Sequence, residues 1–133
     1  AQFIRNIVRG ENIVMKSSGE QFRSWCYVVD CARALLFILL KGGQGEAYNV
    51  ADDASNITIR QLADMIAGIG GRRTVMQLPA EEERRGYSVV KRAVFSTRKL
   101  EALGWSANGE MKDKIRSTIM EVKSAGGAAD GRV

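Results

Sequence analysis

Arginines in two segments are the side chains best suited to bind a ligand. Arg23 follows a turn-forming stretch at residues 19–21 and precedes a run of large residues that predicts a strand. Arg84 stands beside Arg85 and Gly86 in a later segment. A guanidinium group at the mouth of a strand can contact a phosphate or carboxylate through two parallel hydrogen bonds. Two such arginines converging on one pyrophosphate would bind a small anionic ligand, whereas most other arginines are expected on a solvated face.

A tyrosine and a lysine in Y-x-x-x-K spacing, Tyr87 and Lys91, also suggest chemistry. On a helix this spacing places the lysine beside the tyrosine hydroxyl and lowers the pKa of that hydroxyl for proton transfer. Gly86 and the β-branched Val89 and Val90 do not predict a helix here. The spacing is therefore interpreted as coincidental, and no catalytic residue is assigned to this chain.

The sequence lacks histidine, which excludes several kinds of active site. A Ser-His-Asp triad, an H-E-x-x-H zinc site and a Cys/His zinc knuckle all require it. Cys26 and Cys31 are the two cysteines. Small secreted domains usually carry more cysteine pairs, so two free, mostly buried thiols in a reducing cytosol are favoured over a disulfide. No metal site is predicted, and the expected location is cytoplasmic.

Charge and hydropathy also limit the classes of partner. The net charge of +5 comes from basic residues dispersed among acids, without the continuous Lys/Arg face that a nucleic-acid-binding protein needs. The longest apolar run, residues 34–40, is too short to span a bilayer. Neither nucleic acid nor membrane is a predicted partner.

Two glycine groups, at 42–45 and 68–71, follow predicted helices. A phosphate-binding glycine loop instead joins a strand to the N-terminus of a helix. Both groups are interpreted as helix terminators, and no cofactor cradle is predicted in this chain.

The length of 133 residues fits one domain, or part of one. Thr58 and Gln61 form a capping box that predicts a helix start. A helix from Val29 to Lys41 is apolar on most sides and is predicted to be buried. Residues 125–133 are expected to form a flexible tail. The predicted elements are helices over 1–9, 29–41, 58–69, 97–103 and 111–124, and strands over 12–16, 23–28, 46–51 and 74–78. Turn-forming residues are predicted at 17–20 and, with Asp52 among them, at 52–56.

Four segments carry a shared family pattern: GEQFRSWCYVVD at 19–30, GEAYNV at 45–50, ITIRQLA at 57–63 and KLEALGW at 99–105. In this order they resemble the C-terminal part of the extended short-chain dehydrogenase/reductase family, the NAD-dependent sugar-nucleotide epimerases and dehydratases. The first is similar to G-x-Q-x-R-D-[FW]-x-Y-V-x-D and the second to G-E-x-Y-N-[IV]. The third resembles S-I-x-E-L-A, and the fourth K-x-x-x-L-G-W.

The resemblance implies an α/β fold, mostly helical with several short strands. Residues 1–124 would form the C-terminal substrate-binding portion of a two-lobed enzyme, and Ala1 would mark a boundary within a longer protein. The missing N-terminal Rossmann lobe would bind NAD or NADP, and this chain would hold no cofactor. The complete enzyme would transfer a hydride from a sugar carbon to the nicotinamide before epimerisation, elimination or reduction.

The resemblance also implies roles for individual residues. Arg23 and Arg84 correspond to arginines that contact the diphosphate of a nucleoside-diphosphate sugar. Asn49 is expected to join neighbouring loops by hydrogen bonds. Ser24, Tyr87 and Ser96 stand where the family has aspartates. The expected packing and supporting residues are Trp25, Tyr27, Asp30 and Trp105.

The alternative is a non-catalytic module that forms homo-oligomers or binds a small anion. If a missing lobe normally covers Phe3, Ile4, Ile7 and the helix at 29–40, the chain should expose apolar area and self-associate. Either hypothesis therefore predicts a homo-oligomer.

Overall fold

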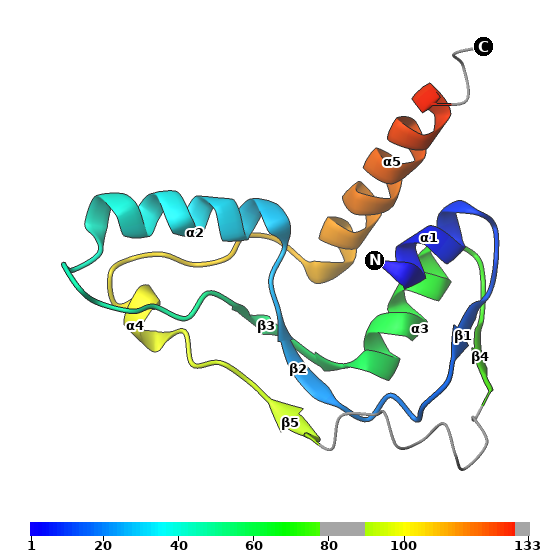
Figure 1. Ribbon diagram of the computed structural model, residues 1–133, viewed down its shortest axis with the longest axis horizontal. Coiled ribbons are helices and arrows are strands. Elements are labelled where there is room, and N and C mark those ends of the chain that lie inside the picture. Colours follow the sequence, from blue (N-terminus) through cyan, green and yellow to red (C-terminus); the bar gives the residue numbers. More distant parts are fainter. Residues whose placement is uncertain (78–89, 130–133) are drawn as a thin grey trace.

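A computed structural model describes residues 1–77 and 90–129 of the chain (Figure 1). It confirms the predicted mixed α/β fold, with helices predominating over short strands. The elements in chain order are α1 (Gln2–Val8), β1 (Ile13–Met15), β2 (Phe22–Trp25), α2 (Val28–Lys41), β3 (Asp52–Thr58), α3 (Ile59–Ile69), β4 (Thr74–Met76), β5 (Arg92–Ala93), α4 (Arg98–Glu101) and α5 (Met111–Ala129).

The described strands form two small sheets. In the first, β1 pairs in parallel with β4, and Ile13 lies opposite Thr74. In the second, β2 is central, antiparallel to β3 and parallel to β5. The two strands predicted on either side of the turn at 17–20 therefore exist, but each belongs to a different sheet.

The third strand lies later in the chain than predicted. Residues 46–51 were expected to form it, with turn chemistry at 52–56, but the strand is β3, at Asp52–Thr58. Its polar residues are accommodated because Asp52 accepts hydrogen bonds from the amide of Ala54 and the hydroxyl of Ser55. β3 pairs with β2 in antiparallel orientation, with Phe22 opposite Thr58, and this pairing satisfies its backbone hydrogen-bonding groups.

The main hydrophobic core lies where α1, α3 and α5 meet β1, on the right of Figure 1. Burial of apolar side chains here is the main source of stability. Its fully or nearly fully buried aliphatic residues include Ile7, Ile13, Ile66, Ile115 and Ile119.

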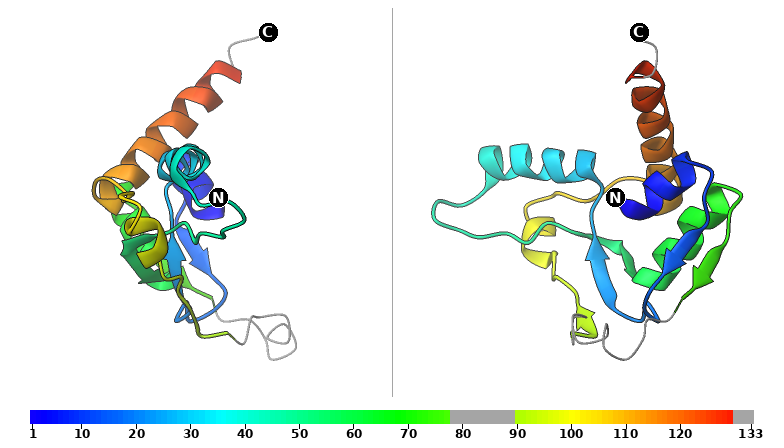
Figure 2. Two further views of the ribbon diagram at one scale, coloured as in Figure 1. Left: turned by 90° about the vertical axis from the view of Figure 1, so that its left-hand side faces the viewer. Right: turned by 45° about the vertical axis from the view of Figure 1, so that its right-hand side comes forward.

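The prediction that α2 is buried is wrong. Figures 1 and 2 show the helix extending away from the main core. One side of the helix contributes Ala34 to a second, smaller core, where it packs with Leu100 and Trp105. Leu39 and Leu40 on its other sides are 80% and 79% exposed. The sequence pattern correctly indicated an apolar helix. Burial of its side chains depends on neighbouring elements, and the described residues pack against only one side of α2.

The helix ends follow their predicted signals. Thr58 and Gln61 form both hydrogen bonds of the capping box at α3. Gly42 and Gly70 are the C-caps of α2 and α3, as the terminator interpretation predicted. The last helix, α5, continues to Ala129, into the segment expected to be a flexible tail. No helix among the described residues has the length and apolar character needed to cross a membrane.

Candidate functional site

The turn before β2 fixes where Arg23 lies. Gly19 has a φ of +68°, a left-handed conformation that glycine adopts without strain. Its carbonyl accepts a hydrogen bond from the amide of Arg60 at 2.9 Å. A Cβ at Gly19 would lie 2.9 Å from that same nitrogen, too close for any other residue without movement. This hydrogen bond connects the turn to the first residues of α3 and so fixes the position of the start of β2 relative to that helix.

Arg23 occupies the central strand of the three-stranded sheet. Its Cα is paired with Ile57 in β3 and Ala93 in β5. The guanidinium donates to the carbonyl of Phe22 at 3.0 Å and to that of Val90 at 2.6 Å. These two bonds orient the group and use two of its five N–H donors. The side chain is partly buried, an arrangement that suits recognition of an anion.

Two residues singled out in the sequence lie outside the described residues: Arg84 and Tyr87. The segment containing both leads directly to Val90, whose carbonyl binds Arg23. The convergence of Arg23 and Arg84 on one ligand therefore stays a prediction.

Trp25 and Tyr27, predicted as packing residues, line a cavity of about 540 Å³ bounded by α1, β2, α3 and α5. The indole nitrogen of Trp25 donates to the carbonyl of Ile57 at 3.3 Å. Most of the lining is apolar, and Ser55, Lys114 and Thr118 contribute polar groups.

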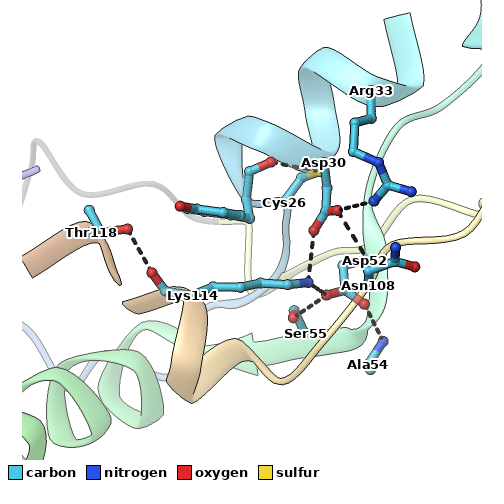
Figure 3. Close-up of polar contacts among 10 residues, drawn as sticks. Cys26, Asp30, Arg33, Asp52, Ala54, Ser55, Asn108, Lys114 and Thr118 are labelled. Carbon is cyan, nitrogen blue, oxygen red and sulfur yellow. Dashed lines mark hydrogen bonds and ion pairs between the residues drawn. The ribbon is translucent and has the colours of Figure 1, made fainter. Parts of the chain in front are cut away.

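Beside this cavity, three buried charged side chains from three elements meet (Figure 3). Lys114 on α5 places its Nζ 2.8 Å from Asp52 Oδ2 on β3 and 2.9 Å from Asp30 Oδ2 on α2. Arg33 pairs with the other oxygen of Asp30 at 2.9 Å, and Ser55 donates to Asp52 at 2.8 Å. With Arg33 included, two cations balance two carboxylates, so the group has no excess charge with which to attract an ionic ligand. We call Lys114, Asp30 and Asp52 the buried charge cluster.

The pKa values in this cluster reflect mutual stabilisation. Burial acts to raise the pKa of Asp52, but hydrogen bonds from Lys114 and Ser55 outweigh it and lower the net pKa. Burial acts to lower the pKa of Lys114, but its bonds to Asp52 and Asp30 raise it overall. Both groups therefore stay charged over a wide pH range, as suits a structural contact rather than proton transfer.

Asn49 and Trp105 occupy supporting positions. Asn49 Nδ2 donates to the carbonyl of Ser96 at 3.1 Å and so joins the segment after α2 to the segment before α4. Trp105 is 5% exposed and packs on Leu100 and Ala34 in the second core.

The sequence reasoning missed Lys114 and Asp52. Lys114 lies next to Ile115, at the edge of the apolar stripe of α5, which was the available signal that its side chain is partly enclosed. Asp52 was interpreted as a turn residue. Nothing local indicated their pairing, because 62 positions separate them.

Across residues 1–77 and 90–129, no three acidic or cysteine side chains are grouped so as to hold a metal ion. Cys26 and Cys31 are free thiols. Each is partly exposed rather than mostly buried as predicted.

Comparison with known proteins gives one consistent family. Residues 1–51 match the model of the NAD dependent epimerase/dehydratase family. The chain is 26% identical over 118 residues to the low-salt glycan biosynthesis protein Agl12 of Haloferax volcanii, and covers 37% of that protein. It is 29% identical over 122 residues to dTDP-glucose 4,6-dehydratase 1 of Escherichia coli and covers 33% of it. These alignments include 89% and 87% of this chain, which thus spans about a third of the length of these relatives.

Solved structures agree on the fold. UDP-glucose 4-epimerase of Thermotoga maritima, solved with UDP-glucose, superposes with a TM-score of 0.77 at 24% identity, over 93% of this chain and 38% of that one. The Bordetella bronchiseptica enzyme WbmF, solved with NAD⁺ and UDP, gives a TM-score of 0.76 at 26% identity, over 96% of this chain and 36% of that one.

Proposed function

Because the chain belongs to the NAD-dependent epimerase/dehydratase family, we propose that it is the nucleotide-sugar-binding portion of an NAD- or NADP-dependent epimerase or dehydratase. Its place would be the C-terminal part of a cytoplasmic enzyme. The ligand would be a nucleoside-diphosphate sugar. The presence of UDP-glucose in the Thermotoga structure and of UDP in the Bordetella structure supports this ligand class.

The observation that carries the proposal is the position of Arg23. Its strand is held on both sides by β3 and β5, and two carbonyl groups orient its guanidinium. A preorganised guanidinium loses little conformational freedom on binding a phosphate. Arg23 would contact the diphosphate, and Arg84, in the segment that leads to Val90, would be the second contact.

The exposed side of α2 supports a missing partner lobe. Leu35, Leu36, Leu39 and Leu40 are between 61% and 80% exposed, and contiguous apolar area of this kind marks an interaction surface. In the complete enzyme the N-terminal Rossmann lobe would cover it. That lobe would hold the nicotinamide cofactor, which supplies the hydride chemistry, while this chain would bind and orient the sugar nucleotide and be inactive alone.

Titration calorimetry of the 133-residue chain with UDP-glucose, dTDP-glucose and inorganic pyrophosphate tests the proposal. Arg23→Ala should weaken binding of the sugar nucleotides by about 10- to 100-fold, the usual cost of losing a hydrogen bond to a charged group. Arg116→Ala, which removes an exposed arginine of α5, is the matched control and should bind as the wild type does. Equal affinities of wild type and Arg23→Ala, or no binding by the wild type, would refute the proposal.

A second candidate is a non-catalytic homo-oligomeric module, which the same exposed leucines favour. Such a module would show thermal stability that rises with protein concentration and no response to UDP-glucose. The nucleotide-sugar proposal expects the stability to rise with added UDP-glucose at fixed protein concentration.

A further inference from the structure

We propose that Cys26 and Cys31 are an oxidisable thiol pair that closes into an intramolecular disulfide at the start of α2. This inference does not depend on the proposed function, because it uses only the geometry of the helix start and the chemistry of the two thiols.

The two cysteines lie on either side of the N-cap of α2. Tyr27 is the N-cap of α2, so Cys26 is the residue before the cap and Cys31 is the fourth residue of the helix. Side chains at these two positions meet across the first turn, where apolar pairs commonly form a hydrophobic staple. In α2 both of these positions are occupied by cysteines.

Both cysteines donate a hydrogen bond to the same carbonyl oxygen. The carbonyl oxygen of Tyr27 accepts hydrogen bonds from the amide nitrogen of Cys31, at an N–O distance of 2.8 Å, and from the thiol of Cys26, at an S–O distance of 3.6 Å. The thiol of Cys26 and the backbone amide of Cys31 therefore share one hydrogen-bond acceptor. Both residues belong to the start of one helix, so a bond between their side chains would involve this turn and not distant elements.

The surroundings of Cys26 set the order in which the two thiols react. Burial, followed by the neighbouring Cys31 and the carboxylate of Asp30, raises the pKa of Cys26. The thiolate of Cys26 is thus disfavoured, and Cys31 makes the first attack on an oxidant. With glutathione disulfide as oxidant, Cys31 forms a mixed disulfide and displaces one glutathione thiolate. Cys26 then loses its proton and attacks the sulfur of Cys31, and a second glutathione thiolate leaves. Two protein thiols are oxidised and one glutathione disulfide is reduced to two thiols.

The consequence for the fold is local. Tyr27 makes no side-chain capping bond, so the first turn of α2 lacks the usual polar cap. A covalent link from Cys26 to Cys31 would fix this turn, next to Asp30 and its partner Lys114. Oxidation would therefore stabilise the folded chain.

The test measures the equilibrium constant for disulfide formation in a glutathione redox buffer, for the folded chain and for the chain unfolded in urea. Mass spectrometry of alkylated samples counts free thiols and identifies the link. We expect the folded chain to favour the disulfide at least about tenfold more than the unfolded chain, equivalent to about 30 mV in potential. An equal or smaller constant in the folded chain would overturn the proposal, as would a product made mainly of intermolecular dimers.

Two variants test the order of attack. Cys26→Ser should accumulate the mixed disulfide of glutathione on Cys31, because no second thiol can resolve it. Cys31→Ser should form the corresponding adduct on Cys26 more slowly, since the thiolate of Cys26 is disfavoured. Both variants lack the stability gain on oxidation that the wild type is expected to show. A thermal midpoint that rises equally on oxidation in all three proteins would contradict the assigned link.

Discussion

Lys114 Nζ lies 2.8 Å from the carboxylate of Asp52, although 62 residues separate them in the chain. With the contact to Asp30, this places one ammonium group between carboxylates from β3 and α2 (Figure 3). The three side chains are at most 9% exposed. The buried apolar residues of α5 and α2 belong to different hydrophobic cores, so these ion pairs join the two helices.

Replacing Lys114 by Met should strongly destabilise the chain. The variant keeps most of the apolar stem but leaves Asp30 and Asp52 buried without their shared cation. Breaking a buried ion pair in this way costs about 3 kcal/mol. Urea unfolding measures the loss, and Lys112→Met, on the exposed face of the same helix, should change stability by less than about 0.5 kcal/mol.

A rescue variant separates charge from packing. If the cost of Lys114→Met comes from uncompensated carboxylates, adding Asp30→Asn and Asp52→Asn should restore much of the lost stability. A triple variant no more stable than Lys114→Met would show that packing of the lysine stem, not charge balance, explains the effect.

Stability should also fall at acidic pH through Asp52. Its pKa is lower in the folded chain than the ordinary 3.8, so its contribution is complete above that value and is lost as pH falls through the lowered pKa. Urea unfolding between pH 7 and pH 2.5 should therefore show a smaller acid-dependent loss for Asp52→Asn than for the wild type. Asp53→Asn, at the neighbouring exposed position, is the control and should retain the wild-type slope.

Self-association should depend on the exposed side of α2. Leu36 and Leu40 are 63% and 79% exposed, so changing both to Glu removes apolar contact area without opening a core. Because burial of one leucine is worth about 2 kcal/mol, the double variant should raise the concentration for half-association at least about tenfold. Light scattering over a concentration series measures this. Met120→Glu, at an exposed site on α5, should associate as the wild type does; a wild type that stays monomeric throughout would contradict the prediction.

Local signals predicted much of the fold. The capping box at Thr58, the glycine ends of α2 and α3, and the strand at Arg23 each depend on residues a few positions apart. The exposure of α2 could not be predicted in the same way. An apolar pattern indicates that a helix face is suited to packing, but it does not show whether a neighbouring element packs against that face. Asp is a residue type common in turns, so the sequence around Asp52 indicated a turn. Its place in β3 instead follows from pairing with β2, where it lies opposite Trp25.

The capping box should contribute measurably to stability. Thr58→Ala removes the acceptor for the Gln61 amide at 3.0 Å and should cost about 1 kcal/mol. Gln61→Ala removes the reciprocal bond to the Thr58 amide, and the double variant should lose less than the sum of the single losses. Thr58→Ser keeps the hydroxyl and should retain most of the stability. Strictly additive losses in urea unfolding would show that the two bonds act independently.

The segment after α2 should be held by its hydrogen bond to the segment before α4. Asn49 donates to the Ser96 carbonyl at 3.1 Å, and Lys99 forms an ion pair with Glu46 nearby. Since an exposed hydrogen bond contributes about 1 kcal/mol, Asn49→Ala should lower the free energy of unfolding by up to that amount. It should also accelerate amide exchange in residues 46–51, because β pairing of this segment is absent from the described part of the chain. Gln44→Ala, at an exposed position of the same loop, should leave both measurements unchanged; equal exchange rates in wild type and Asn49→Ala would mean that the ion pair and Tyr48 packing hold the segment without Asn49.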